Sequence, residues 1–202
     1  MGKPRRGSRV LTPVNKGGDM KVAVIGRGNV GGGLAKLWEA AGHDVTALGH
    51  EGGDVSGSEA ILLACPSGAI EDALEGVEGI GDTPIIEATN VFGSGRPEGF
   101  DSLAEFVKSQ TSSPVAKAFN ANFAALYDRL GEARVPPSMV FAADEGARVV
   151  TEQLIRDAGY EPVNAGGLEN ARALEDFLGV IFAIAQGGTG PFWYRIAPPE
   201  TF

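Results

Sequence analysis

The pattern Gly26-Arg27-Gly28-Asn29-Val30-Gly31 places glycines at the spacing of a phosphate-binding turn. It follows the apolar stretch Lys21–Ile25, which is typical of a buried strand, and precedes an alanine- and leucine-bearing segment from Gly32 to Ala41. Glycine lets the backbone bend sharply there and lets a pyrophosphate come closer than a Cβ would allow. The phosphate then binds to free N–H groups at the start of the helix. A chain with 30 glycines contains such patterns by chance. The strand before the turn and the helix after it favour dinucleotide binding over a turn without a ligand.

Strands and helices alternate along the chain. Apolar runs predict strands at 21–25, 43–48, 58–64, 84–90, 114–120, 138–142 and 160–164. Amphipathic stretches predict helices at 29–41, 67–74, 101–109, 123–130, 145–158 and 168–185. We therefore predict an α/β fold, a doubly wound (Rossmann) parallel sheet with a small C-terminal αβ extension from about residue 138. Only about a dozen residues separate the second and third strands. The helix between them is therefore expected to be absent or a single turn.

Small and amide side chains stand where the predicted strands end. Ligands of such sheets lie beyond the carboxyl ends of the strands, so these residues are the expected rim of the site. The rim comprises Gly49-His50-Glu51, Cys65-Pro66, Thr89-Asn90, Asn120 and Asn164. Amides of this kind can hydrogen-bond ribose hydroxyls and a carboxamide. Cys65 is expected to contact the cofactor by its shape rather than as a reactive thiol.

The second half of the chain contains few acid–base groups. The only histidines are His43 and His50, and the last lysine is Lys117. A hydroxy-acid dehydrogenase would need a late lysine or histidine to move the proton of the alcohol. Hydride transfer between two redox cofactors needs only two stacked rings and the exclusion of water. Tyr127 or Glu169 remains available as a proton donor, which keeps an imine reductase open.

The residues near the adenosine ribose give mixed signals about the cofactor. Glu51 lies 20 residues after Gly31, where an acid favours the ribose diol of NAD. His50 beside it can touch a phosphate, and Arg27 is a nearby cation, which favours NADP. NADP and NAD both remain possible from these residues.

Composition excludes several classes of function. The net charge of −9 argues against binding to a nucleic-acid backbone. The longest apolar run, 178–185, is too short to cross a membrane. The single cysteine allows no internal disulfide and fits a cytoplasmic location. Residues 1–19 are expected to form a disordered basic tail, with 20–202 as the NAD(P)-binding domain and Met20 as a plausible start of translation.

Several stretches resemble a known family, the NADPH-dependent reductases of the deazaflavin coenzyme F-420 and related dinucleotide-binding NADP oxidoreductases. The turn at 24–31 matches, as do Ala64-Cys65-Pro66 and Ala88-Thr89-Asn90. The most specific matches are Lys117-Ala118-Phe119-Asn120 and the segment 163–175, which reads VNAGGLENARALE. The resemblance covers about Met20 to Arg195.

The resemblance implies a small homodimer that binds NADP(H) over the strand ends and transfers a hydride between the nicotinamide and a second flat ring. It places Asn90 and Asn120 near the nicotinamide. This chain departs from the family at Gly49-His50-Glu51, where the family has Gly-Ser/Thr-Arg to hold the 2′-phosphate. It also has Val91 where the family has a proline.

We predict that the following residues bind the cofactor: Gly26, Arg27, Gly28, Asn29, Val30, Gly31, Gly49, His50, Glu51, Cys65, Pro66, Thr89, Asn90 and Asn120. No side chain is assigned a catalytic or metal-binding role. Glu169, Arg172 and Glu175 are more typical of ion pairs or a dimer contact than of catalysis. The aromatic side chains at 182 and 192–194 are more typical of a core or dimer interface than of a flavin platform. The expected function is hydride transfer between NADP(H) or NAD(H), with NADP(H) slightly favoured, and an acceptor such as deazaflavin coenzyme F-420. The alternatives are an imine or imino-acid reductase and a non-catalytic NAD(P)-sensing module.

Overall fold

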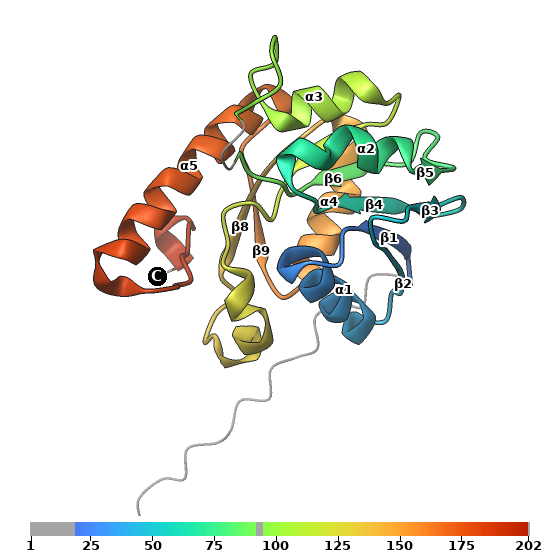
Figure 1. Ribbon diagram of the computed structural model, residues 1–202. Coiled ribbons are helices and arrows are strands. Elements are labelled where there is room, and N and C mark those ends of the chain that lie inside the picture. Colours follow the sequence, from blue (N-terminus) through green and yellow to red (C-terminus); the bar gives the residue numbers. More distant parts are fainter. Residues whose placement is uncertain (1–18, 92–94, 202) are drawn as a thin grey trace, which may run out of the picture.

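The computed structural model describes residues 19–91 and 95–201. In these residues one sheet has the strand order β2-β1-β4-β6-β7-β8-β9, and all neighbouring strands are parallel except β7 and β8 (Figure 1). The strands are β1 (Lys21–Ile25), β2 (Asp44–Leu48), β4 (Ala60–Leu63), β6 (Ile85–Glu87), β7 (Val115–Lys117), β8 (Ser138–Ala143) and β9 (Glu161–Asn164). The predicted doubly wound sheet is confirmed, and it is mainly rather than wholly parallel. The predicted disordered tail lies outside the described residues except for Asp19.

The direction of the last two strands was predicted wrongly. β8 is antiparallel to β7, with Ala116 opposite Ala143, and β9 is parallel to β8. The end of β9 therefore lies at the opposite end of the strands from the end of β7. Asn164, which stands there, is away from the other predicted rim residues. The helix predicted at 123–130, between β7 and β8, is present as the 3-10 helix η2 (Ala124–Glu132). Because β7 and β8 are antiparallel, the end of β7 and the start of β8 lie at the same end of the sheet, and the connection does not have to cross the sheet.

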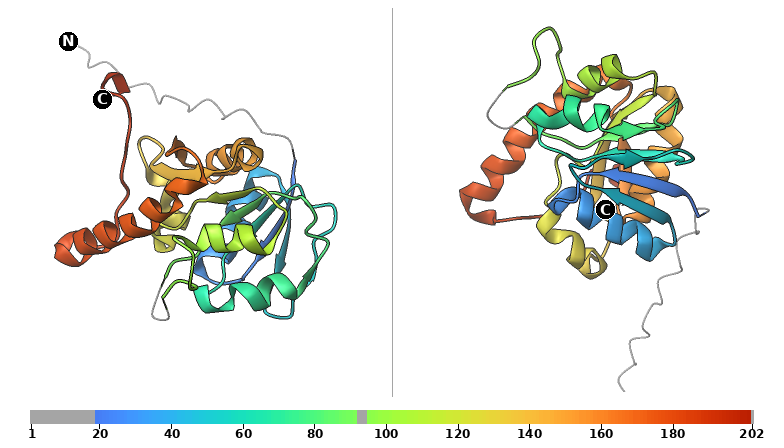
Figure 2. Two further views of the ribbon diagram at one scale, coloured as in Figure 1. Left: turned by 90° about the horizontal axis from the view of Figure 1, so that it is seen from above. Right: turned by 45° about the vertical axis from the view of Figure 1, so that its right-hand side comes forward.

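Helices cover both faces of the sheet. α1 (Asn29–Ala41) and α4 (Glu145–Asp157) pack on one face, and α2 (Ile70–Glu75) and α3 (Leu103–Gln110) on the other (Figures 1 and 2). Successive residues of β1 alternate between the two cores, with Val22 and Val24 in one and Ala23 and Ile25 in the other. This alternation explains why the central strands β1 and β4 are apolar along nearly their whole length, as parallel strands buried on both faces must be.

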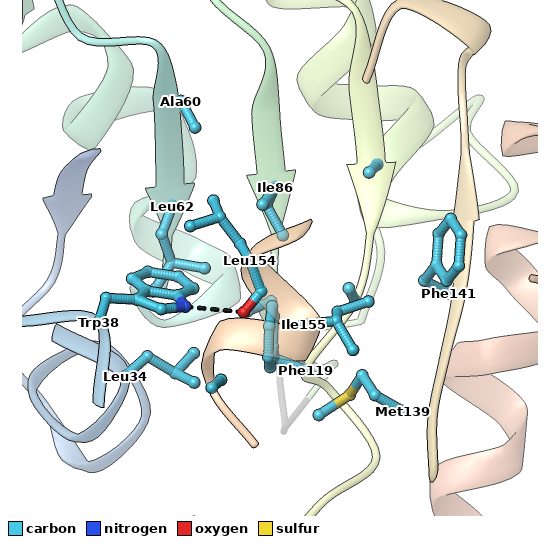
Figure 3. Close-up of a cluster of buried hydrophobic side chains, with 14 of the residues drawn as sticks. Leu34, Trp38, Ala60, Leu62, Ile86, Phe119, Met139, Phe141, Leu154 and Ile155 are labelled. Atoms are coloured by element: carbon cyan, nitrogen blue, oxygen red, sulfur yellow. Dashed lines mark hydrogen bonds between the residues drawn. The ribbon is translucent and has the colours of Figure 1, made fainter. Parts of the chain in front are cut away.

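A tryptophan joins the two helices on the first face (Figure 3). The Nε1–H of Trp38 on α1 donates a 2.8 Å hydrogen bond to the carbonyl oxygen of Leu154 on α4. The ring of Trp38 meets the ring of Phe119 edge to face, with centroids 5.8 Å apart. Phe119 has a φ of +61° and is buried. This left-handed conformation turns the chain just after β7, immediately before Asn120.

The link between β2 and β4 contains no helix, as predicted. It contains instead the two-residue strand β3 (Gly53–Asp54), which pairs with β5 (Val77–Glu78) in a small second sheet. A Cβ on Gly52, whose φ is +69°, would meet the carbonyl oxygen of Gly76. The link therefore lies flat against the chain that follows α2, and the end of β2 stays open.

The C-terminal helix extends beyond the sheet. α5 (Ala171–Ile184) begins against the second core through Ala171, and its outer part projects from the body of the molecule (Figures 1 and 2). A π-helical turn, Ala185–Thr189, follows. The chain then returns to the start of β8, where the Ser138 N–H donates to the carbonyl oxygen of Tyr194 at 2.9 Å. This hydrogen bond anchors the C-terminal segment to the sheet. No helix in the described residues is long and apolar enough to cross a membrane.

Candidate functional site

The three glycines of the turn are glycines for different reasons. Gly26 has a φ of +110°, and a Cβ there would strike the carbonyl oxygen of Ala64. A Cβ on Gly31 would strike the carbonyl oxygen of Gly26. A Cβ on Gly28 would meet no protein atom within 4 Å, and its φ of −72° suits any residue. The fold itself therefore requires Gly26 and Gly31, whereas the open space at Gly28 fits the close approach of a ligand.

The N-terminus of α1 fits an anion. Gly28 is its N-cap residue and offers no side chain to the first turn, which also contains no acidic residue. The first bond of the helix runs from the Gly32 N–H to the Gly28 carbonyl at 2.8 Å. The N–H groups of Asn29, Val30 and Gly31 therefore have no acceptor within the helix. These donors, with the positive end of the helix dipole, suit a pyrophosphate.

Two adjoining pockets lie on either side of this turn and share a wall made of Gly28, Ala64, Cys65 and Pro66. The first, of about 390 Å³, lies toward the end of β2 and α2 and is lined also by Ile25, Gly26, Arg27, Gly49, His50, Gly52, Ala69, Asp72, Ala73 and Gly76. The second, of about 640 Å³, is lined also by Asn29, Val30, Ser67, Gly68, Ala88, Thr89 and Asn90. A two-part cavity centred on this glycine turn has the shape that an extended dinucleotide requires.

Arg27 and Glu51 form an ion pair at the mouth of the first pocket. The guanidinium Nη2 lies 2.8 Å from Glu51 Oε1, and the Nε–H donates to the carbonyl oxygen of Ala47 at 3.0 Å. The hydrogen bond from its own backbone N–H, together with the charge of Arg27, holds the pKa of the exposed Glu51 carboxyl below its usual value. Arg27 and His50 line the pocket, and Glu51 does not. Glu51 therefore influences the pocket indirectly, because it pairs with the Arg27 guanidinium that lines the pocket.

Cys65 lies in the wall between the two pockets. Burial, and to a lesser extent the negative charge of Glu87, raises the pKa of its thiol to about 11. The thiol is therefore protonated at neutral pH and is a poor nucleophile. This supports its interpretation as a small wall residue.

Asn90 and Asn120 face each other across the ends of β6 and β7. The Asn90 Nδ2–H donates to the carbonyl oxygen of Asn120 at 2.8 Å. The Asn120 Nδ2–H donates to Asn90 Oδ1 at 3.2 Å and to the carbonyl oxygen of Leu174 on α5 at 3.0 Å. Asn90 lines the second pocket, whereas the buried Asn120 lines neither. Asn120 thus holds the Asn90 side chain by hydrogen bonds without itself lining the pocket.

Most of the predicted binding residues come together at this cavity. Gly31, Glu51 and Asn120 are the predicted residues that do not line it. Two features of the site were not predicted from the sequence. Asp72 and Ala73 of α2 line the first pocket, and Glu87 and Lys117 form a buried ion pair beneath Thr89. The available signal was a charged residue in each of two otherwise apolar strands, IIEAT and VAKAF.

No family model and no curated protein matches this chain. Solved structures do match. A protein from Arthrobacter sp. FB24, provisionally assigned as an F420-dependent NADP reductase, superposes with a TM-score of 0.75 at 23% identity and covers 89% of this chain and 100% of its own. The fold is that of the NAD(P)-binding Rossmann domains.

Two further Rossmann proteins show how widely this fold is shared. The reductive aminase from Aspergillus terreus, solved with NADPH4, cyclohexanone and allyl amine, has a TM-score of 0.61 at 12% identity, and the match covers 84% of this chain and 62% of the aminase. The 3-hydroxyisobutyrate dehydrogenase of Mycobacterium tuberculosis, solved with L-serine, has a TM-score of 0.59 at 13% identity, with 87% and 73% covered. The present chain spans less than two thirds of the aminase. At these identities the likeness establishes the Rossmann fold, and the reaction has to be argued from the site.

Proposed function

We propose that this protein is an NAD(P)-dependent oxidoreductase that transfers a hydride directly between the nicotinamide and a flat acceptor such as a deazaflavin. The observation that carries the proposal is the lining of the second pocket. Among its residues only Cys65 titrates, and its pKa is raised. A reaction without protein acid–base chemistry suits such a site, because hydride transfer between two rings requires alignment and exclusion of water.

In this proposal the residues bind and orient. The N–H groups of residues 29–31 hold the pyrophosphate, and Gly28 admits it. Cys65 and Pro66 form the wall against which the dinucleotide bends, and the Asn90 side chain orients the nicotinamide half. The bound dinucleotide supplies the hydride chemistry.

We infer that NADP(H) is slightly favoured over NAD(H). Arg27 lines the adenosine pocket and is held there by the Ala47 carbonyl, whereas Glu51 does not line that pocket. A 2′-phosphate would compete with the Glu51 carboxylate for the same guanidinium, which keeps the expected preference small.

We also propose that the protein is a homodimer and lies in the cytoplasm. The outer part of α5 presents Val180 and Ile184, which are exposed in the single chain, and a second copy would cover them. The single cysteine of the sequence fits a reducing compartment.

The test is titration with NADPH and NADH, followed by a screen of acceptors that includes the deazaflavin coenzyme F-420, FMN and riboflavin. We expect binding of a nicotinamide dinucleotide and reduction of the deazaflavin. Binding without reduction of any flat acceptor would contradict direct transfer and would favour the NAD(P)-sensing module.

An imine or imino-acid reductase is the second candidate, because the chain shares its fold with a reductive aminase. It needs a proton donor at the pocket. Burial raises the pKa of Tyr127, which packs in the first core against Gly33. Glu169 is exposed and follows β9 at the other edge of the sheet. Neither lines the second pocket, so turnover of a cyclic imine is not expected.

A further inference from the structure

Four charged side chains form a buried ion cluster beneath the rim of the second pocket. The cluster consists of Glu87, Lys117, Glu175 and Arg96. Lys117 Nζ lies 2.6 Å from Glu87 Oε2 and 3.3 Å from Glu175 Oε1, and the Arg96 Nε–H donates to Glu175 Oε2 at 2.7 Å. The side chains of Lys117 and Glu87 are 0% exposed. Glu87 and Lys117 stand opposite each other at the ends of β6 and β7, Glu175 comes from α5, and Arg96 from the chain before α3.

Stability alone is a poor explanation for this cluster. Removing several charges from water costs more than their attraction commonly returns, and buried ion pairs can often be replaced by apolar side chains without loss. The neighbouring residues Ile86 and Ala116 are apolar and fully buried. A buried ion pair in such strands holds its neighbours in one geometry, because every partner must be satisfied.

The geometry that the cluster holds is that of Thr89. Glu87 Oε1 accepts hydrogen bonds from both the backbone N–H and the hydroxyl of Thr89. Lys117 Nζ donates to the carbonyl oxygen of the same residue at 2.6 Å. Both polar groups of the Thr89 backbone are therefore fixed, and Asn90 is the next residue.

The cluster also connects this rim to two distant elements. Glu175 Oε1 accepts the N–H of Leu103, the first residue of α3, at 2.7 Å. Leu174, the neighbour of Glu175 on α5, accepts the hydrogen bond from Asn120 that supports Asn90. α5 is therefore connected to Asn90 by two routes, one through the ion cluster and Thr89 and the other through Asn120.

We propose that Lys117 is a positioning residue that sets the nicotinamide half of the site. Through Glu87 and Thr89 it fixes the rim at Thr89–Asn90, and through Glu175 it ties that rim to α5 and Arg96. The pyrophosphate turn is built separately, from the end of β1 and the start of α1. The cluster therefore governs how the second half of the dinucleotide is held and leaves the first half unaffected. This inference rests on the proposed binding of NAD(P)(H).

The two halves can be measured separately with ADP and with NADPH. ADP reaches the turn and the adenosine pocket but not Asn90, whereas NADPH extends to both. The variants are Lys117→Met, Glu175→Gln and Arg96→Gln. The matched control is Arg156→Gln, which removes an exposed ion pair to Glu152 on α4, a helix on the other face of the sheet. Because Arg96 lies nearer the surface than the other three, its variant is expected to fold even where Lys117→Met does not.

We expect the cluster variants to weaken NADPH binding by about tenfold and to change ADP binding less than twofold. The control Arg156→Gln should change neither NADPH binding nor ADP binding. Hydrogen exchange should accelerate at the amides of residues 88–90 and remain unchanged at residues 29–31. Parallel losses for ADP and NADPH, or a folded Arg96→Gln with unchanged NADPH affinity and unchanged exchange, would overturn the inference. If the unmodified protein binds ADP but no dinucleotide, the proposed function fails, and the exchange measurement still decides whether the cluster positions Thr89–Asn90.

Discussion

The fold requires a glycine at position 26, whereas the glycine at position 28 leaves space for a ligand. A Cβ at Gly28 meets no protein atom within 4 Å, whereas a Cβ at Gly26, where φ is +110°, strikes the carbonyl oxygen of Ala64. We expect Gly28→Val to leave thermal stability nearly unchanged while abolishing dinucleotide binding. Gly26→Ala should lower the melting temperature by several degrees, because a left-handed residue with a Cβ costs about 1–2 kcal/mol before any clash. Thermal melts and titration with NADPH measure both. A stable Gly28→Val variant that binds normally would contradict the placement of the pyrophosphate.

Glu51 is expected to control the choice of cofactor through Arg27. Glu51→Gln removes the charge that pairs with Arg27 2.8 Å away and leaves the guanidinium free for a 2′-phosphate. We predict that the ratio of NADP to NAD affinity rises, by about tenfold for each 1.4 kcal/mol gained. Glu132→Gln, which removes the similarly exposed partner of Arg129, is the control and should leave the ratio unchanged. The prediction is wrong if both variants give the same ratio as the unmodified protein.

Cys65 should be slow to react. Its pKa lies at about 11 instead of about 9 because the thiol is buried. At about pH 8 the folded protein therefore has about a hundredfold less thiolate than an ordinary thiol, and alkylation by iodoacetamide should be slower to match. The rate should rise as the pH passes through 10 toward 11. The unfolded protein in guanidinium chloride is the control, since the sequence has one cysteine. Rapid labelling of the folded protein at pH 8 would show that the thiol is not buried.

At the scale of elements, Trp38 decides how α1 sits on α4. Trp38→Phe keeps an aromatic side chain but removes the indole N–H that donates the 2.8 Å hydrogen bond to Leu154. We expect a loss of about 1–3 kcal/mol, seen as a lower midpoint in urea with an unchanged slope. Trp193→Phe is the matched control, because the buried Trp193 Nε1 has no hydrogen-bond partner among the residues that the structure describes. Equal losses in the two variants would mean that the hydrogen bond does not join the helices.

Elements were easiest to predict where one periodicity ran without interruption. β1 and α1 have the predicted bounds, because an apolar run, a glycine turn and Gly42 at a φ of +104° mark every boundary locally. The segment 123–130 carries an apolar pattern compatible with a helix but forms the 3-10 helix η2. Local pattern does not distinguish the two kinds of helix when the chain must stay at one edge of the sheet.

At the scale of the whole molecule, the exposed apolar part of α5 is the surface through which we expect two copies of the chain to dimerise. Val180→Glu adds a charge to the exposed apolar part of this helix, so we expect it to convert a dimer to a monomer in sedimentation equilibrium. Val149→Glu, on an exposed position of α4, is the control and should leave the mass unchanged. A monomeric unmodified protein, or a Val180→Glu dimer of unchanged affinity, would contradict the proposed homodimer.

The sequence by itself determined the alternating α/β order, the glycine turn after β1 and most of the residues around it. These features are local, because a turn needs its glycines within a few residues and a buried parallel strand is apolar wherever it lies. Only the tertiary structure decided the direction of β8 and β9, which removed Asn164 from the rim. It also placed Asn120 behind Asn90, and brought Lys117 between Glu87 and Glu175. Those partners lie 30 and 58 positions from Lys117 along the chain. Their meeting depends on strand order and on the path of α5, which no short pattern encodes.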